Sequence, residues 1–317
     1  MLSPLLNWLS PAGPQARLSV LIFHRVMPEP DALFPDEMHA RRFDEVCGWI
    51  KSWFNVLPLD QAVARIAGAS LPARAACITF DDGYADNFHV ALPILQHHGL
   101  TATFFIATDF LDGGCMWNDS VVESVRNTKC ATLDLSCLGL GCHATGSLGQ
   151  KQRTIADLIP QIKYLPAAHR ILTTAQIAQL AQARSPRDLM MRSEELVALH
   201  RAGMQIGAHT QSHPILALLD ADQTRREIHG SKHFLERLLG ERIGLFAYPN
   251  GKPGEDYTPL TVDVVRSLEF DAAVSTAWGT TGAGDDVFQI RRFTPWDKSR
   301  LRFGARMVGN LYKNSSK

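Results

Sequence analysis

The sequence predicts an α/β fold in which a parallel barrel is built from repeated strand–helix units. Short apolar runs of strand length alternate with segments of helical period, at least six times along the chain. The polar residues best suited to catalysis follow the ends of the expected strands, where α/β barrels place their chemistry. No glycine-rich phosphate loop opens the first unit, which favours a barrel over an open nucleotide-binding sheet.

The first half of the chain shows this alternation most clearly. A strand is expected at 18–23, where the residues are almost continuously apolar, and a helix at 43–53, where Val46, Trp49 and Ile50 share one face. A short strand at 55–57 and a helix at 59–67 follow, and Gly68 ends that helix. Strand 75–80, helix 88–98 with its stop at Gly99, and strand 101–107 complete this half.

The same alternation returns after residue 192. We expect a helix at 196–201, ended by Gly203, and a strand at 204–208. Helix 223–239 and strand 243–247 form the next unit, and helix 261–268 and strand 272–275 form the last. Residues 1–118 and 193–297 are therefore assigned to one discontinuous barrel domain.

The segment 119–192 interrupts this rhythm with small strand-like pieces and with helical segments at 155–164 and 168–180. We interpret it as a mixed, mainly helical insertion that covers the mouth of the barrel. Residues 298–317 are expected to form a basic amphipathic helix at the C-terminus.

Composition narrows the classes of function. The chain of 317 residues has 32 Lys and Arg against 32 Asp and Glu, so no overall positive charge favours a nucleic-acid partner. Residues 1–15 lack the pattern of a secretory signal, and no run of about 18 apolar residues predicts a spanning helix. We expect a cytoplasmic protein whose six cysteines are mostly reduced.

Two adjacent carboxylates, Asp81 and Asp82, follow strand 75–80. Because neighbouring side chains at a strand end point in different directions, one can bind a metal while the other faces a reacting water. A turn without chemical function is the alternative, since Asp82 and Gly83 form a common hairpin pair. The following segment has a helical pattern, which weakens the hairpin.

Two histidines, His209 and His213, follow strand 204–208. Their spacing suits one face of a helix, but Pro214 disfavours helical backbone at the residue before it. We therefore expect a tight loop that carries both imidazoles and a helix that begins at Pro214. Two solvated loop histidines are the alternative. Because the carboxylates also lie at a strand end, we expect all these groups to share one metal site.

Together, the segments TFDDG (79–83) and HTQSH (209–213) resemble the signature motifs of the polysaccharide deacetylases, the NodB-homology family of carbohydrate esterase family four. The resemblance spans the chain from the first strand to about Pro295. It implies a deformed (β/α) barrel that holds a divalent metal, usually zinc. It also implies that Asp82, His209 and His213 are ligands and that Asp81 is the general base.

The resemblance further implies groups around the substrate. The family's third motif would place a backbone donor for the oxyanion at Asn250, and we assign Tyr248 of the same turn to the substrate as well. The arginine usual in this motif is replaced by Ala247, and the late Leu-x-His motif is not evident. A branch similar to exopolysaccharide- and capsule-linked deacetylases has a histidine after the first strand. His24 is therefore our candidate acid or substrate contact, with a histidine packed beneath the rim as the alternative.

Trp117 and Arg292 are further candidates for contact with the substrate. Trp117 belongs to a Trp-x-Asp pattern with Asp119 that resembles this branch, and its ring could stack on a sugar. A core tryptophan that anchors the insertion is the alternative. Arg292, expected after the last strand together with Arg291, could position the base or bind an anionic group, unless it is a solvated rim charge.

The sequence thus predicts a hydrolase that uses Zn²⁺, or another divalent transition metal, to remove N-acetyl groups from an N-acetylated sugar in polysaccharide or glycolipid metabolism. Hydrolysis of a non-sugar amide and an inactive glycan-binding protein are alternatives. A redox iron site is a third, but Thr210 and Gln211 beside the first histidine are not acidic, unlike the usual pattern of that class.

Both ends of the chain carry apolar residues, among them Leu5 and Trp8, and Arg300 and Arg302 accompany them near the C-terminus. Such faces can lie on an anionic membrane, which predicts peripheral contact with the inner membrane and a lipid-linked substrate. In the alternative, both helices simply pack on the barrel.

Overall fold

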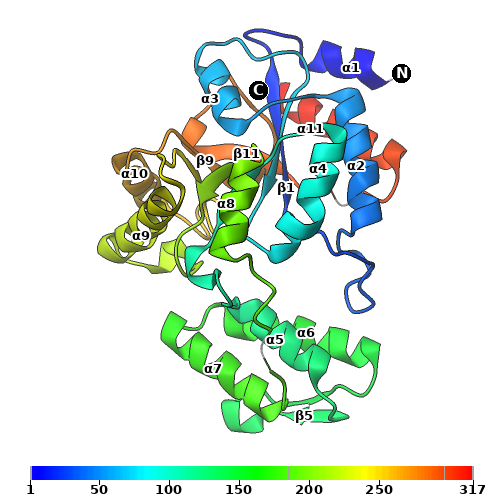
Figure 1. Cartoon of the computed structure of the whole chain (residues 1–317), viewed down its shortest axis with the longest axis vertical. Coiled ribbons are helices and arrows are strands. Elements are labelled where there is room, and N and C mark those ends of the chain that lie inside the picture. Colours follow the sequence, from blue (N-terminus) through cyan, green and yellow to red (C-terminus); the bar gives the residue numbers. More distant parts are fainter. Residues whose placement is uncertain (1, 185, 296, 316–317) are drawn as a thin grey trace.

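The computed structural model describes residues 2–184, 186–295 and 297–315 and contains the predicted parallel barrel (Figure 1). Its seven strands are, in order around the barrel, β1 (Arg17–Phe23), β11 (Ile290–Phe293), β9 (Ala272–Trp278), β8 (Leu245–Ala247), β7 (Gln205–Ala208), β4 (Thr103–Ile106) and β3 (Ala75–Phe80). The pairing of β1 with β3, which aligns Val20 with Cys77, closes the ring. Short strands β2 (Asn55–Val56) and β10 (Thr281–Gly282) pair with β3 and β1.

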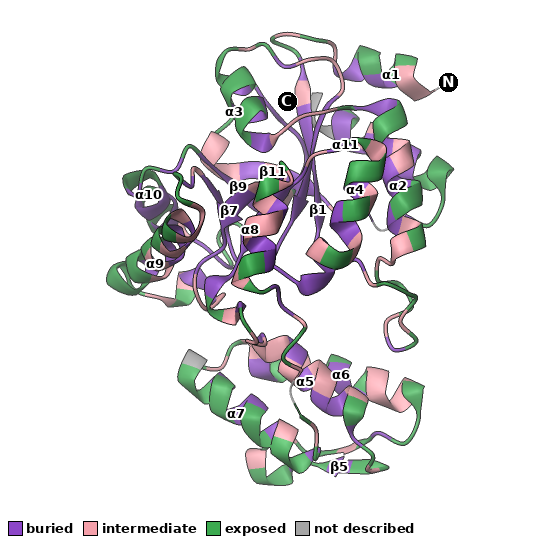
Figure 2. Ribbon diagram, in the orientation of Figure 1, coloured by how far each residue is buried: buried purple, intermediate pink, exposed green. Residues whose placement is uncertain are grey.

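Alternation along the strands separates two cores. Val20, Cys77 and Phe105 belong to a buried cluster to which most barrel strands contribute, as expected for the barrel interior. Phe80 and Phe104, which lie an odd number of positions from Cys77 and Phe105, point to the other side and belong to the second cluster, between barrel and helices, where their rings stack 4.8 Å apart. Figure 2 shows the barrel strands mostly buried and the surrounding helices exposed on their outer faces.

Amphipathic helices surround the barrel. They are α1 (Leu2–Leu9), α2 (Ala40–Trp53), α3 (Leu59–Ala67), α4 (Leu92–His98), α8 (Ser193–Arg201), α9 (Ala221–Leu239), α10 (Pro259–Ser267) and α11 (Arg300–Ser315). The buried residues of α3, including Leu59 and Ile66, join the interior cluster, so α3 closes the end of the barrel where the strands begin. The opposite end is left for the chemistry. Among the described residues, no helix is long and apolar enough to cross a bilayer.

The insertion forms a lobe of its own beyond the C-terminal ends of the strands (Figure 1). It contains α5 (Trp117–Asn127), the antiparallel pair β5 (Thr132–Asp134) and β6 (Cys142–Ala144), α6 (Leu148–Lys163) and α7 (Ala167–Leu180). Its helices bury a separate apolar core that includes Val121, Leu158 and Ile177. The lobe begins at Trp117, two residues before the expected boundary, and α8 returns the chain to the barrel.

One local expectation was wrong, and two further details differ from the sequence analysis. No helix begins at Pro214, since only a 3₁₀ turn (Leu216–Leu218) precedes α9, whose N-terminus is fixed by the Asp220 side chain accepting from the Gln223 amide. The helix expected at 88–98 starts with a π-helical turn, Asn87–Ala91, before α4. Strand β11 was missed altogether. Residues 316 and 317 of the expected C-terminal helix lie outside the described residues.

Candidate active site

Three of the predicted ligands meet at the C-terminal end of the barrel. Asp82 follows β3 with a φ of 78°, and His209 is the first residue after β7. The Oδ1 atom of Asp82 lies 3.5 Å from Nε2 of His209 and 3.4 Å from Nε2 of His213. One carboxylate oxygen and two imidazole nitrogens therefore surround one point, from strands on opposite sides of β4.

These three residues fit a divalent transition metal. Oδ1 of Asp82 is buried and has no hydrogen-bond partner among the described atoms, and a buried carboxylate oxygen without a partner is rare unless a cation satisfies it. Ligand atoms bound tetrahedrally at the usual zinc distances lie about 3.3 Å apart, close to the spacing of this group.

Electrostatics favours the metal-binding protonation states of Asp82 and His213, whereas burial lowers but the nearby carboxylates of Asp82 and Asp81 raise the pKa of His209, with a net rise. Burial alone would raise the pKa of Asp82, but the interactions with His209 and His213 hold it well below its usual value. Burial lowers the pKa of His213 to about 4, so its imidazole is neutral at neutral pH. A carboxylate and a neutral imidazole are the forms that bind metal.

A backbone carbonyl fixes the orientation of His209. Its Nδ1 lies 2.7 Å from the carbonyl oxygen of Ala247 at the end of β8. A carbonyl only accepts hydrogen bonds, so Nδ1 carries a proton, and in the neutral imidazole the lone pair of Nε2 then faces the other ligands and is available to a metal.

Asp81 is held by a buried arginine. Both carboxylate oxygens of Asp81 accept hydrogen bonds from Arg292, each at 2.7 Å, and Nε of Arg292 donates to the carbonyl of Ser275 at 2.8 Å. Burial alone would raise the pKa of Asp81, but the Arg292 guanidinium lowers it below its usual value. Asp81 is therefore an ionised proton acceptor beside the ligands.

This placement corrects the expectation that Arg292 contacts the substrate. Arg292 lies on β11, is 1% exposed, and has its donors engaged by Asp81, Thr79 and Ser275. It positions Asp81 instead, the other role considered for it, and so supplies the arginine that the third motif lacks at Ala247.

The histidine loop is held by a single glutamate of α9. Glu227 accepts hydrogen bonds from the backbone amides of Gln211 and Ser212 at 3.0 and 2.9 Å, and from the Ser212 hydroxyl at 2.6 Å. His213 itself has a φ of 52°, a left-handed conformation that this bonding helps to maintain. Sequence reasoning missed Glu227, because no local pattern links it to the loop.

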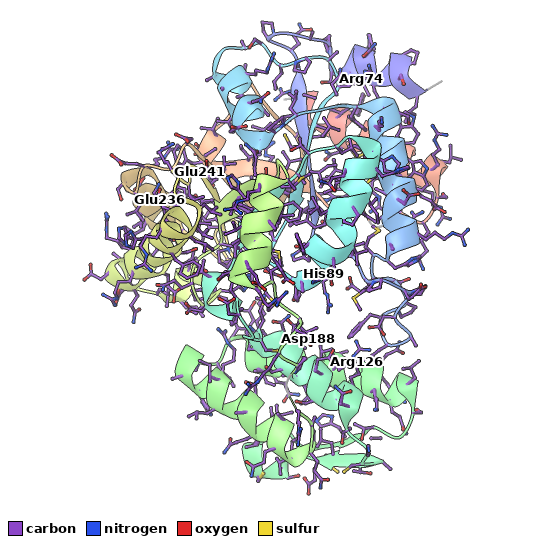
Figure 3. The ribbon with its side chains drawn as sticks, viewed as in Figure 1. Arg74, His89, Arg126, Asp188, Glu236 and Glu241 are labelled. Atoms are coloured by element: carbon purple, nitrogen blue, oxygen red, sulfur yellow. The ribbon has the colours of Figure 1, made fainter. Side chains whose placement is uncertain are left out.

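A cavity of about 1000 Å³ opens beside the metal ligands. It lies between the segment that follows β1, helix α5 of the insertion and the segment that follows β11. Its lining includes His24, Asp82, Tyr84, Asp119, Arg126 and Lys298. Arg126, labelled in Figure 3, pairs with Asp31 at 2.6 Å and so joins the insertion to the segment after β1.

His24 occupies the rim of this cavity, as expected. It is the first residue after β1, its side chain is exposed, and Nδ2 of Asn87 holds its carbonyl at 2.8 Å. A coulombic interaction with His24 contributes to the lowered pKa of Asp82, so His24 lies within electrostatic reach of this carboxylate. Its role as an acid stays a prediction.

Asp119 is a cavity residue that sequence reasoning noted only as part of a pattern. The hydroxyl of Tyr84 donates to its Oδ2 at 3.0 Å, and Tyr84 stands two residues after the ligand Asp82. Burial raises the pKa of Asp119 to about 7. This carboxyl therefore changes charge near neutral pH at the edge of the cavity.

Two predicted substrate contacts lie elsewhere. Tyr248 is fully buried, donates its hydroxyl to the carbonyl of Phe288 at 3.0 Å and stacks on Tyr257, so it is a core residue. Trp117 packs against the core of the insertion with the Arg170 guanidinium 5.2 Å from its ring, which matches its alternative as an anchor.

Asn250 lies in the turn after β8 with a φ of 58°, and its carbonyl accepts from the Thr276 hydroxyl. Its role as an oxyanion donor stays a prediction.

Comparison with known proteins supports one family. A family profile for polysaccharide deacetylase matches residues 68–129 and 162–273, together more than half of the chain. YxkH of Bacillus subtilis (strain 168), assigned by its name to the polysaccharide deacetylases, is 20% identical over 90% of this chain and 73% of its own length.

Solved structures share the fold over nearly the whole chain. The deacetylase PplD of Streptococcus pyogenes, solved with acetate, has a TM-score of 0.61 and 16% identity, and covers 93% of this chain and 98% of its own. IcaB of Ammonifex degensii has a TM-score of 0.61 and 18% identity, with 93% and 97% covered. With its two motifs joined in one site on this barrel, the chain belongs to the polysaccharide deacetylase family.

Proposed function

We propose that the protein is a zinc-dependent deacetylase that removes N-acetyl groups from a polymeric or lipid-linked sugar. The observation that carries the proposal is the buried, unpartnered Oδ1 of Asp82 facing two imidazoles, beside an ionised Asp81 that is not needed as a ligand. A divalent ion held by Asp82, His209 and His213 supplies Lewis acidity for amide hydrolysis.

The remaining groups transfer protons, stabilise the oxyanion or hold other groups in position. Asp81 takes the proton of the attacking water, and Arg292 keeps the carboxylate ionised and fixed in direction. His24, exposed at the rim, gives a proton to the departing sugar amine. Asn250 offers a backbone donor to the oxyanion from the turn after β8. His209 stays oriented by the carbonyl of Ala247 throughout.

The size and walls of the cavity favour a sugar oligomer over a small amide. About 1000 Å³ is at the upper end of the range for small-molecule sites, and the lining contains both carboxylates and arginines. Hydrolysis of a non-sugar amide remains the second candidate, because the same centre would serve it.

Acetate release from a panel of N-acetylated glycans, with and without a chelator, tests the proposal. We expect release from at least one oligomer, its loss on chelation and its recovery with added Zn²⁺. Release that survives complete metal removal would contradict the metal-dependent mechanism. Release only from non-sugar amides would support the second candidate.

We further propose that the protein works in the cytoplasm and touches the inner membrane. Helix α11 has basic residues and no acidic ones, and Trp8, Leu5 and Leu301 are exposed on α1 and α11, which pack together. Helix α1, which precedes β1, lies at the end of the barrel away from the insertion (Figure 1), whereas α11 begins two residues after Lys298 of the cavity lining.

Flotation with vesicles tests this contact. We expect purified protein to float with vesicles that contain anionic lipid and to remain below with purely zwitterionic ones. A Trp8→Ala/Leu301→Ala variant should float less. Protein that stays in the soluble fraction with both kinds of vesicle would remove the proposal.

A further inference from the structure

A second group of metal-binding side chains lies on the outside of the barrel. Asp44 of α2 and His97 and His98 of α4 bring their ligand atoms within 4.8 Å of one another, and none of the three lines the cavity. Within residues 2–184, 186–295 and 297–315, only this group and the Asp82 group bring three such side chains together. We propose that Asp44, His97 and His98 bind a second divalent transition metal, which links α2 to α4.

The geometry already brings donors from both helices together. Nε2 of His98 lies 2.7 Å from Oδ1 of Asp44, and the rings of His97 and His98 have centroids 5.1 Å apart at an interplanar angle of 82°. Two imidazoles thus approach one carboxylate from the last turn of α4. Helix α4 ends at Gly99 with a φ of 63°, and the partial negative charge of a helix C-terminus favours a cation.

The donor set defines the class of ion. Two imidazoles and a carboxylate suit Zn²⁺, Ni²⁺ or Cu²⁺ better than Mg²⁺ or Ca²⁺, which prefer oxygen ligands. Cys47, one turn along α2 from Asp44, does not add a thiolate, because burial raises the pKa of its thiol. The site therefore has the same donor set as the active centre, one carboxylate and two imidazoles.

Exposure sets the two sites apart. The side chain of Asp44 is 52% exposed and His97 is exposed, whereas the active-site ligands are mostly buried. Water can complete the coordination of an ion at the outer site, and the surrounding solvent weakens its attraction to the carboxylate. We expect weaker binding and faster exchange there than at the active centre.

Helices α2 and α4 already pack together, and the ring of His98 lies beside Gly48 of α2. An ion bound by side chains of both helices requires this packing and so binds only the folded chain. Such binding raises stability as the logarithm of the free ion concentration once that concentration exceeds the dissociation constant. The outer site is therefore a stabilising link between the two helices.

Zinc counting on the full-length protein tests the inference. Metal-stripped protein would be dialysed against buffered Zn²⁺, and bound ions per chain compared between wild type and the His97→Ala/His98→Ala variant. We expect the variant to bind one ion fewer. The matched control is His229→Ala/His233→Ala, an exposed, stacked histidine pair of α9 that is not part of either three-ligand group. We expect this control to bind as many ions as wild type.

Two other outcomes would overturn the inference. Equal zinc in wild type and the His97→Ala/His98→Ala variant would exclude the site, and an equal loss in the α9 control would show unspecific binding by exposed histidine pairs. An Asp82→Asn variant separates this inference from the proposed function. It should lose the active-site ion, keep the outer one, and still gain thermal stability from added Zn²⁺.

Discussion

At the scale of single residues, the proposed chemistry requires that Asp81 is not a ligand. Both of its oxygens accept hydrogen bonds from Arg292, and the group that could hold a metal ion consists of Asp82, His209 and His213. We predict that Asp81→Asn lowers acetate release by about 100-fold or more, because a general base is lost, while active-site zinc is retained. Rate and zinc content would be measured on the same preparation. Asp82→Asn is the control, since it should lose both, and zinc loss in Asp81→Asn would contradict this division of roles.

Arg292 controls both the ionisation of Asp81 and the stability of the barrel. Its guanidinium lowers the pKa of Asp81, so Asp81 favours the folded state above its unfolded pKa and this contribution is lost as pH falls through the folded value. In Arg292→Met, burial without a partner should raise that pKa. We predict that the acid limb of the rate profile moves to higher pH and that the free energy of unfolding in urea falls by about 3–5 kcal/mol.

The control for this prediction is Arg126→Met, which removes a partly exposed ion pair outside the barrel. It should leave the acid limb in place and cost far less stability. An unchanged acid limb in Arg292→Met would show that Asp81 is not the group that the profile reports.

Asp119 predicts a distinct dependence of stability on pH. Because burial raises its pKa to about 7, the folded protein holds this proton more tightly than the unfolded chain, and stability falls as pH rises from about 4 through 7. Asp119→Asn cannot ionise, so its melting temperature should decline less than that of wild type between about pH 5 and 8. Asp134→Asn, at an exposed site, should behave as wild type. Parallel wild-type and Asp119→Asn curves would contradict the raised pKa.

At the scale of elements, α9 supports the metal centre through one side chain. Glu227 bonds two amides and one hydroxyl of the loop between His209 and His213. We predict that Glu227→Ala weakens zinc binding by about 10-fold or more, in the range known for groups that orient metal ligands. Competition with a chromophoric chelator measures the affinity. Glu227→Gln keeps one acceptor oxygen, so its zinc affinity should lie between those of wild type and Glu227→Ala. Unchanged zinc affinity in Glu227→Ala would show that Glu227 does not support the metal centre.

The elements also show what local sequence can predict. Strand 75–80 and helix 59–67 lie where the pattern of apolar residues predicted them, because the strand is an apolar run buried on both faces and the helix buries one face. Strand β11 was missed because two of its four residues are arginines. Arg292 is buried only because Asp81, 211 positions away, compensates its charge. Tyr248 likewise stacks on Tyr257 only in the folded chain, so the residues next to Tyr248 in the sequence could not show that it is a core residue.

At the scale of the whole molecule, the barrel and the insertion meet at the short turn that follows Asp82. The insertion has its own core around Leu158, yet both of its ends contact the turn after Asp82: Tyr84 bonds Asp119, and the Met191 amide donates to the Gly83 carbonyl at 3.0 Å. A separate core can open without the barrel, since stability is not uniform across a structure. The turn, however, belongs to both the insertion and the metal centre.

Hydrogen exchange can distinguish independent opening of the insertion from coupling of the insertion to the metal centre through this turn. We predict that amides of the barrel strands exchange slowest and that those of α6 and α7 exchange faster, as one unit. Added Zn²⁺ should slow exchange at residues 82–85 and 209–213, because the ion would link these two segments. It should leave α6 and α7 nearly unchanged, because they belong to the separate core of the insertion. The Asp82→Asn variant should lose the effect at both segments. If zinc slowed exchange throughout the insertion, the barrel and the insertion would act as one cooperative unit, and the lobe would have to be regarded as part of the metal centre.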